Sequence, residues 1–260
     1  MVKRILTISF WAISIAGVLL LAWLARQHYL NSPVNGLEIK IVREQQSGFL
    51  SREQLAEMVY SLTDSLKSKR IRDIRMAGLE NDLQQNPWIA DADVSATLSG
   101  VLQLVVRERL AVLRAYNRKH QSLYVDSEGV IFPINPNFAA RVPIVNGYLD
   151  FPALTHNTAH ISDSAYRKSF LWPAFQLNEK LRKDKFLSSL IDQIYINSLG
   201  EIELSPKLGS ASVLIGDLTN LEEKLLHLKA FYTQKGLSSD LADYRLVNLK
   251  YENQIVCTKR

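Results

Sequence analysis

The side chains best suited to metal or redox chemistry in this sequence are five histidines and one cysteine. Zinc sites need closely spaced ligands, such as an HExxH motif or several cysteines. The histidines show no such spacing, and a lone Cys257 excludes an internal disulfide and a cysteine-based zinc cluster. Because Cys257 lies in an apolar run, we interpret it as a small buried or half-buried hydrophobe. The histidines are His28, His120, His156, His160 and His227. We therefore predict neither a metal site nor a cofactor.

Three further segments contain residue types that enzymes use, but none completes a catalytic motif. Gly209 to Ser212 resembles the G-x-S-x-G nucleophile elbow of a hydrolase but lacks its second glycine. Gly209 to Gly216 is not a Walker loop, because no Lys-Ser/Thr pair follows to hold a phosphate. Asp126 and Glu128 share one turn, where they are ordinary turn residues rather than a glycosidase pair. Arg107 to Arg109, at the end of a strand, is typical of a solvated edge or of a local ion pair. We predict that the chain is not an enzyme, and an exported cell-wall enzyme is the alternative.

The composition is that of an ordinary folded protein, with 47% hydrophobic and 22% charged residues in a chain of 260. The net charge of +5 arises from five basic residues at the two ends; without them, the basic and acidic residues are equal in number. A nucleic-acid-binding surface concentrates Lys and Arg to neutralise phosphates. We therefore predict no nucleic-acid partner. Since no catalytic motif is complete, we also predict no small-molecule substrate. The five residues are Lys3, Arg4, Arg26, Lys259 and Arg260.

The segment Ile5 to Ala25 carries no charge. As a helix it would be about 31 Å long, close to the hydrocarbon thickness of a bilayer. A cleaved signal peptide has a shorter apolar core and an A-x-A-like site, so we predict a transmembrane helix at 5–25. Lys3 and Arg4 precede the helix, which favours a cytoplasmic tail at 1–4 and an exported remainder.

After a connector at 26–36, the next elements describe a small α+β unit. Leu37 to Ile41 alternates as a strand, and Ser51 with Gln54 forms a capping box at the start of a helix. A second helix over Ile74 to Gln85 ends before Pro87. The strands Ile89 to Leu98 and Val101 to Glu108 follow. The order β-α-α-β-β predicts two helices on one face of a three-stranded sheet.

The chain from about Arg109 onward is rich in strands with flanking helices, which predicts a larger mixed β domain with an antiparallel-rich sheet. Pro173 should split or kink the helical stretch Asp163 to Arg182. The last part of the chain, Tyr244 to Thr258, is predicted to form a closing pair of strands. A chain that ends in a strand often leaves it at a sheet edge, where another protein can add a strand. The expected strands lie at 111–116, 122–125, 130–134, 141–146, 191–196, 201–204 and 213–215, and the last helix lies at 220–234.

Several motifs, taken in order along nearly the whole chain, resemble the FtsQ/DivIB family of bacterial cell-division proteins. The motifs are Asn86-Pro87-Trp88-Ile89 with Val94, Val106-Arg107-Glu108-Arg109, Leu123-Tyr124-Val125-Asp126 to Gly129, Val142-Pro143 to Gly147, and Asn248-Leu249-Lys250-Tyr251. The resemblance implies a POTRA domain at 37–107 and the family's β domain at 108–260. A POTRA-containing assembly or secretion factor is a further alternative, although the long strand series of an outer-membrane barrel is missing.

The resemblance further implies a scaffold of the division septum, located in the bacterial inner membrane, that catalyses no reaction. Such a scaffold holds the partners FtsB and FtsL by strand addition, on the last strand and the adjacent helix of the β domain. It regulates septal peptidoglycan synthesis, while the POTRA domain serves recruitment. The chain departs from the family in its short cytoplasmic tail and in the unfamiliar insertion Asp150 to Ser164. The partner-binding residues that the resemblance implies are Leu249, Lys250, Tyr251, Asn253, Gln254, Ile255 and Val256.

Overall fold

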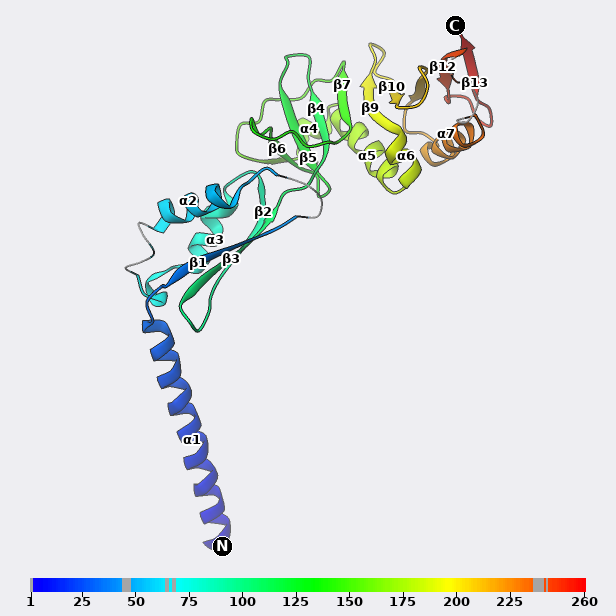
Figure 1. Ribbon diagram of the computed structural model, residues 1–260. Coiled ribbons are helices and arrows are strands. Elements are labelled where there is room, and N and C mark those ends of the chain that lie inside the picture. The colour runs from blue at the N-terminus through cyan, green and yellow to red at the C-terminus, as the bar shows by residue number, and fades with distance from the viewer. Residues whose placement is uncertain (1, 44–47, 64–65, 67–68, 236–240, 242) are drawn as a thin grey trace. The chain divides into compact units, whose positions relative to one another are not determined.

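The computed structural model describes residues 2–43, 48–63, 66, 69–235, 241 and 243–260. The chain forms two compact units (Figure 1). The first comprises Met1–Arg43 with Leu50–Glu108, and the second comprises Glu44–Phe49 with Arg109–Arg260. Each unit combines helices with a sheet, which confirms the predicted α+β class.

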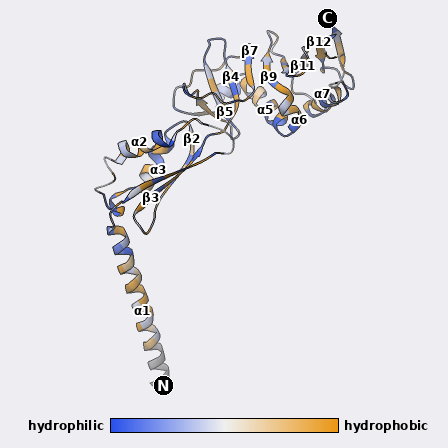
Figure 2. Ribbon diagram, in the orientation of Figure 1, coloured by the Kyte–Doolittle hydropathy of each residue, from blue (hydrophilic) through white to orange (hydrophobic). Residues whose placement is uncertain are grey.

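The first unit begins with the long helix α1, Val2–Asn31. Its part Ser9–Asn31 is long and apolar enough to cross a membrane, and the most apolar 18-residue stretch within it has a mean hydropathy of 1.7. No residue of the most apolar stretch is buried within the protein, and apolar residues follow one another along the helix in Figure 2. The helix continues beyond the predicted end at Ala25. Ser32 and Asn31 help to end it, because their side chains donate hydrogen bonds to carbonyl groups of the last turn.

The sheet of the first unit has three strands in the order β1-β3-β2. The strands are β1 (Gly36–Val42), β2 (Ile89–Ala96) and β3 (Val101–Glu108). β3 pairs with β1 in parallel and with β2 antiparallel. Leu102, Leu104 and Val106 alternate with more exposed residues along β3 and are fully buried, so the two-residue period of the sequence defines the core face.

Helices α2 (Arg52–Thr63) and α3 (Met76–Gln84) pack on this sheet, with the short 3-10 turn η1 (Ile71–Asp73) between them. The predicted capping box is present: the Ser51 amide donates to Gln54 Oε1 at 2.9 Å, and the Gln54 amide donates to Ser51 Oγ at 3.2 Å. The second helix begins two residues later than predicted, because Ile74 still belongs to the turn that ends η1.

The second unit is built on a sheet of ten strands in the order β13-β12-β11-β10-β9-β7-β4-β5-β6-β8. The pairs β4–β7, β7–β9 and β11–β12 are parallel and the others are antiparallel, so the sheet is mixed as predicted. The strands are β4 (Ala111–Tyr116), β5 (Ser122–Asp126), β6 (Val130–Pro133), β7 (Ile144–Gly147), β8 (Ala159–His160), β9 (Ile191–Ile196), β10 (Ile202–Pro206), β11 (Ser212–Gly216), β12 (Tyr244–Asn248) and β13 (Val256–Lys259).

The helices of this unit are α4 (Ser164–Arg167), α5 (Leu171–Arg182), α6 (Lys185–Leu190) and α7 (Leu221–Lys235). The predicted split of the helical stretch is present, but it lies at Lys168 to Phe170 and not at Pro173. Pro173 is the third residue of α5. A proline is tolerated in the first turn of a helix, because the amide that it lacks would have no partner within the helix there.

Two segments join the core of the second unit unexpectedly. Phe49, which the sequence analysis leaves inside the first domain, packs its ring edge-on against Tyr124, Phe132 and Phe138 at centroid distances of 5.6, 5.8 and 4.9 Å. Asn135 Nδ2 donates to the carbonyl oxygen of Phe49 at 2.8 Å. The second segment is the unfamiliar insertion 150–164, which supplies β8 and core side chains, and is therefore an integral part of the fold.

Candidate partner-binding edge

The strand β13 ends the ten-stranded sheet, as the sequence analysis expects for the C-terminal run. It pairs antiparallel with β12, with Val256 opposite Asn248 and Cys257 opposite Val247. Arg260 donates its amide to the Asp243 carbonyl at 2.9 Å. Successive amides of a strand alternate in direction, so the amide of Lys259 points away from β12. The outer hydrogen-bonding edge of β13 therefore points away from the sheet.

The seven predicted partner-binding residues are divided between the strand β13 and the connection that precedes it. Val256 lies in β13, and the other six lie in the connection between β12 and β13. Leu249 is buried in the core, and its amide donates to the Leu214 carbonyl at 2.9 Å, so its side chain serves packing. Lys250 donates to Glu201 Oε1 across the sheet and extends over Gly216.

Tyr251 and Val256 are the exposed apolar members of this set, with 52% and 40% of their surfaces accessible. Ile255 is half-buried against the core, and Gln254 is exposed. Asn253 adopts a left-handed backbone conformation with φ of 57°, which asparagine tolerates better than most residues and which turns the chain back into β13. The connection thus presents one large aromatic side chain directly beside the edge strand.

A cavity of about 190 Å³ lies between this connection and the N-terminal end of α7. Tyr251, Leu249 and Glu252 line one side, and residues before and within α7 line the other. No residue of the second side is predicted from the sequence, although the resemblance implies an adjacent helix, because no local pattern shows which residues of α7 meet the β12–β13 connection. The residues of this second side are Asp217, Thr219, Asn220, Glu223, Lys224 and His227.

One ion pair and one hydrogen bond hold the walls of this cavity in place. Lys224, which is only 8% exposed, donates from Nζ to the Asp217 carbonyl at 3.0 Å and to Asp217 Oδ1 at 3.1 Å. The hydrogen bond from Lys224 lowers the pKa of the Asp217 carboxyl. Asn220 Nδ2 also donates to Glu252 Oε1 at 3.2 Å, which links the two walls.

Lys250 and Glu201 fix the connection from the other side. The hydrogen bond from Lys250 lowers the pKa of Glu201, and the same bond raises the pKa of Lys250. Both groups are therefore charged at neutral pH. Lys224 and Lys250 are each paired with a carboxylate of the protein, so the cavity offers a polar rim and an aromatic side chain for binding.

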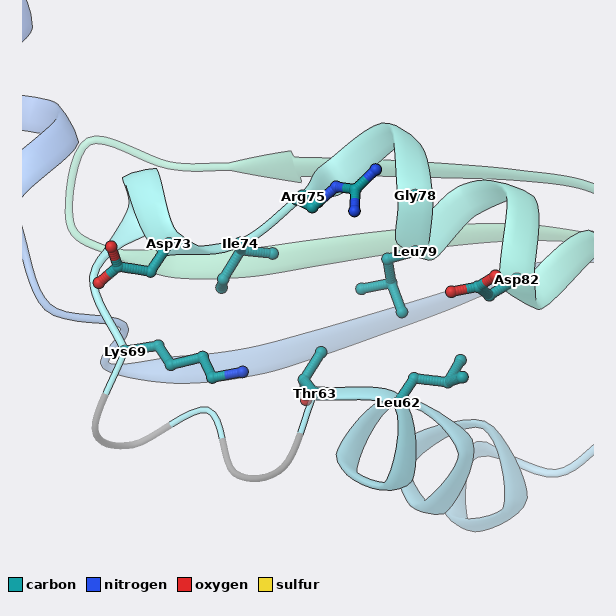
Figure 3. Close-up of a pocket in the computed structure, with 9 residues that line it drawn as sticks. All are labelled: Leu62, Thr63, Lys69, Asp73, Ile74, Arg75, Gly78, Leu79 and Asp82. Atoms are coloured by element: carbon teal, nitrogen blue, oxygen red, sulfur yellow. The ribbon is translucent and has the colours of Figure 1, made fainter.

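A second hollow, of about 350 Å³, lies in the first unit between α2, η1 and α3. Figure 3 shows Lys69 and Asp82 directed toward the space between the helices, whereas the carboxylate of Asp73 points away from it. The one hydroxyl, of Thr63, donates to the Val59 carbonyl at 2.6 Å. The residues that line this hollow thus include no nucleophile held by a base. Among the described residues, no group of three or more His, Cys, Asp or Glu side chains is placed to hold a metal ion.

The fold and these surfaces define a class of protein in which one apolar helix precedes a POTRA-like unit and a long mixed sheet. Residues 33–107 match the family model of the POTRA-like domain. Residues 111–258 match the model described as FtsQ/DivIB, C-terminal related, which covers more than half of the chain. The chain belongs to the FtsQ/DivIB family.

One relative is "Cell division protein FtsQ" of Rhodothermus marinus (strain ATCC 43812 / DSM 4252 / R-10). The chain is 28% identical to it over 188 residues, which amount to 71% of this chain. The match spans 65% of the length of the relative, slightly less than two thirds.

Proposed function

We propose that this chain is a non-catalytic component of the bacterial cell-division machinery, and that it binds a partner protein by strand addition at β13. Family membership and the name of the relative support the role in cell division. The observation that carries the mode of binding is the position of β13 at the end of the sheet, beside the exposed Tyr251. A strand added there gains main-chain hydrogen bonds, and side-chain pockets add specificity.

In this proposal the partner strand lies alongside β13 and pairs with outward-pointing amides such as that of Lys259. Tyr251 and Val256 supply apolar contacts, and the cavity beneath Tyr251 accepts a partner side chain. Lys250 acts through the ion pair with Glu201, which holds the connection in place. Leu249 acts by anchoring the connection in the core.

The partner that we propose is an FtsB-type protein, with an FtsL-type protein in the same complex. Lys3 and Arg4, which precede the uncharged segment 5–25, favour a cytoplasmic N-terminus, so that both units lie outside the cytoplasm at the inner membrane. The complex would then act at the septum in the control of peptidoglycan synthesis. The first unit would contribute to recruitment.

A pull-down with the detergent-solubilised full chain tests this function. The exported segment of the FtsB-type protein from the same organism is the bait, and Tyr251→Ala and Lys259→Pro are the test variants. We expect both to weaken capture strongly, because one removes the exposed aromatic side chain and the other removes an outward donor. Tyr60→Ala removes a comparably exposed aromatic side chain, 48% accessible, from α2 in the first unit and should bind like the unmodified chain.

Thermal unfolding of each variant shows whether the fold survives. Full capture by both folded variants would overturn strand addition at β13. Failure of the unmodified chain to capture the segment would overturn the proposed partner.

A further inference from the structure

The end of the first unit that follows α1 carries a cluster of basic side chains. Lys69, Arg70, Arg72 and Arg75 lie in and around η1, and Asp73 is the one acidic residue between them. The three arginines are exposed and Lys69 is partly exposed. Asp73 offsets part of this charge, since it accepts the Arg70 amide at 3.1 Å and lies 3.6 Å from Arg72 Nε. A clear positive surplus remains.

Backbone hydrogen bonds fix this cluster at the end of α1. Val34 donates its amide to the Lys69 carbonyl at 3.0 Å, and Ile71 donates its amide to the Ser32 carbonyl at 3.1 Å. The cluster and the chain that leaves α1 are therefore held together by main-chain contacts, which do not depend on flexible side chains. The basic residues cannot move away from the helix end without breaking these bonds.

The turn between β2 and β3 lies at the same end of the unit, as Figure 1 shows. Tyr29, in the last turn of α1, donates its hydroxyl to the Ala96 carbonyl at 2.7 Å. Asn35 Nδ2 donates to the Ser99 carbonyl at 2.7 Å. These bonds place Leu98 near the helix end, with 88% of its surface exposed. An exposed leucine and the three arginines thus lie at the end of the unit from which α1 emerges, whereas the side chain of Lys69 is directed into the hollow between α2 and α3.

The length of α1 places this face close to the membrane surface. The uncharged run ends at Ala25 and the helix ends at Asn31, so the helix rises only about 9 Å between them. The headgroup region on each side of a bilayer is about 5–8 Å thick. Arginine and lysine side chains also extend their charged ends several ångströms from the backbone. The basic cluster therefore lies within reach of lipid headgroups.

We propose that this membrane-proximal face, formed by Arg70, Arg72, Arg75 and Leu98, docks on anionic phospholipid headgroups of the bilayer that α1 crosses. The proposal rests on α1 spanning the membrane and is independent of partner binding at β13. Basic residues near an anionic surface are attracted to it, and salt screens the attraction. Leu98 adds an apolar contact with the interface. Because α1 tethers the face, a weak contact suffices to hold the first unit in one orientation.

Fluorescence quenching in vesicles tests the proposal on the full chain. A dye is attached at Ser99→Cys, beside Leu98, in a chain that carries Cys257→Ser so that one thiol is present. The vesicles are pure phosphatidylcholine or equal parts phosphatidylcholine and phosphatidylglycerol, each with a trace of lipid that bears a nitroxide on its headgroup. We expect stronger quenching in the anionic vesicles, and we expect high salt to reduce it to the level of the neutral vesicles.

Two double variants make the test specific. Arg72→Gln with Arg75→Gln should abolish the difference between the vesicles. Lys40→Gln with Arg52→Gln removes as many exposed charges from β1 and from the start of α2, and should leave the difference intact. Equal quenching in both vesicles, or an equal loss in both double variants, would overturn the proposal. Flotation with the vesicles after a carbonate wash reports separately on whether α1 is inserted.

Discussion

The carboxylate of Glu108, the last residue of β3, lies 3.0 Å from the guanidinium Nε of Arg43, just after the end of β1. Glu108 is only 5% exposed, and its other oxygen accepts the Leu50 amide at 2.7 Å. One buried carboxylate thus joins the ends of two strands to the start of the chain that leads into α2. An unpaired buried donor is costly, so this arrangement depends on the acid being present.

We expect Glu108→Ala to destabilise the first unit by about 2–3 kcal/mol, because the buried Leu50 amide and Arg43 lose their acceptor. Urea unfolding of the full chain, followed by hydrogen exchange of the β1 and β3 amides, measures the effect. Glu57→Ala removes an exposed carboxylate from α2 and should change the unfolding free energy by less than about 0.5 kcal/mol. Equal effects of the two substitutions would contradict the role assigned to Glu108.

Phe49→Ala should destabilise the second unit, although residue 49 precedes most of the first unit in the chain. Loss of a buried phenylalanine costs about 3–5 kcal/mol. Phe49 is 2% exposed among three aromatic rings, so we expect a value in this range. Hydrogen exchange of β5 and β6 amides is the measurement, and Phe170→Ala, at a side chain 42% exposed, is the control. Faster exchange confined to β1 and β3 would refute the assignment of Phe49 to the second unit.

The parts of this fold that could be predicted from sequence are those that depend on neighbouring residues. The Ser51–Gln54 capping box and the alternation along β3 are local, and both are found where predicted. The aromatic cluster around Phe49 and the wall of α7 beside Tyr251 bring together segments distant in sequence. No periodicity or turn signal encodes such contacts, so residues such as Lys224 and Asp217 could not be assigned to the candidate site.

Low pH should weaken the attachment of the β12–β13 connection, because protonation of Glu201 removes its ion pair with Lys250. The pKa of Glu201 is lowered from 4.5 in the folded protein, chiefly by the hydrogen bond from Lys250. A carboxyl with a lowered pKa contributes stability above its unfolded pKa and loses it as pH falls through the folded value. We expect Glu201→Gln to lower the melting temperature at neutral pH, with a difference that shrinks below about pH 4.5. A difference that persists unchanged into strong acid would exclude this ion pair as its source.

Gly147 at the end of β7 should be more sensitive to substitution than another glycine in a left-handed conformation. Its φ is 99°, and a Cβ there would lie 2.2 Å from the carbonyl oxygen of Ile196 in β9. Gly209 has a φ of 77°, but its Cβ would meet no atom closer than the Leu241 Cβ at 3.4 Å. The unfavourable backbone alone costs about 1–2 kcal/mol, so Gly209→Ala should destabilise by about that amount.

Gly147→Ala adds a collision with rigid backbone to the same conformational cost. It should therefore destabilise the second unit by clearly more than Gly209→Ala and accelerate hydrogen exchange along the parallel β7–β9 pair, which joins the two halves of the sheet. Urea unfolding of the two variants side by side separates the collision from the backbone effect. If the two unfolding free energies were equal, the close approach of β9 to Gly147 would contribute nothing, and the sheet would tolerate a side chain at its central parallel pair.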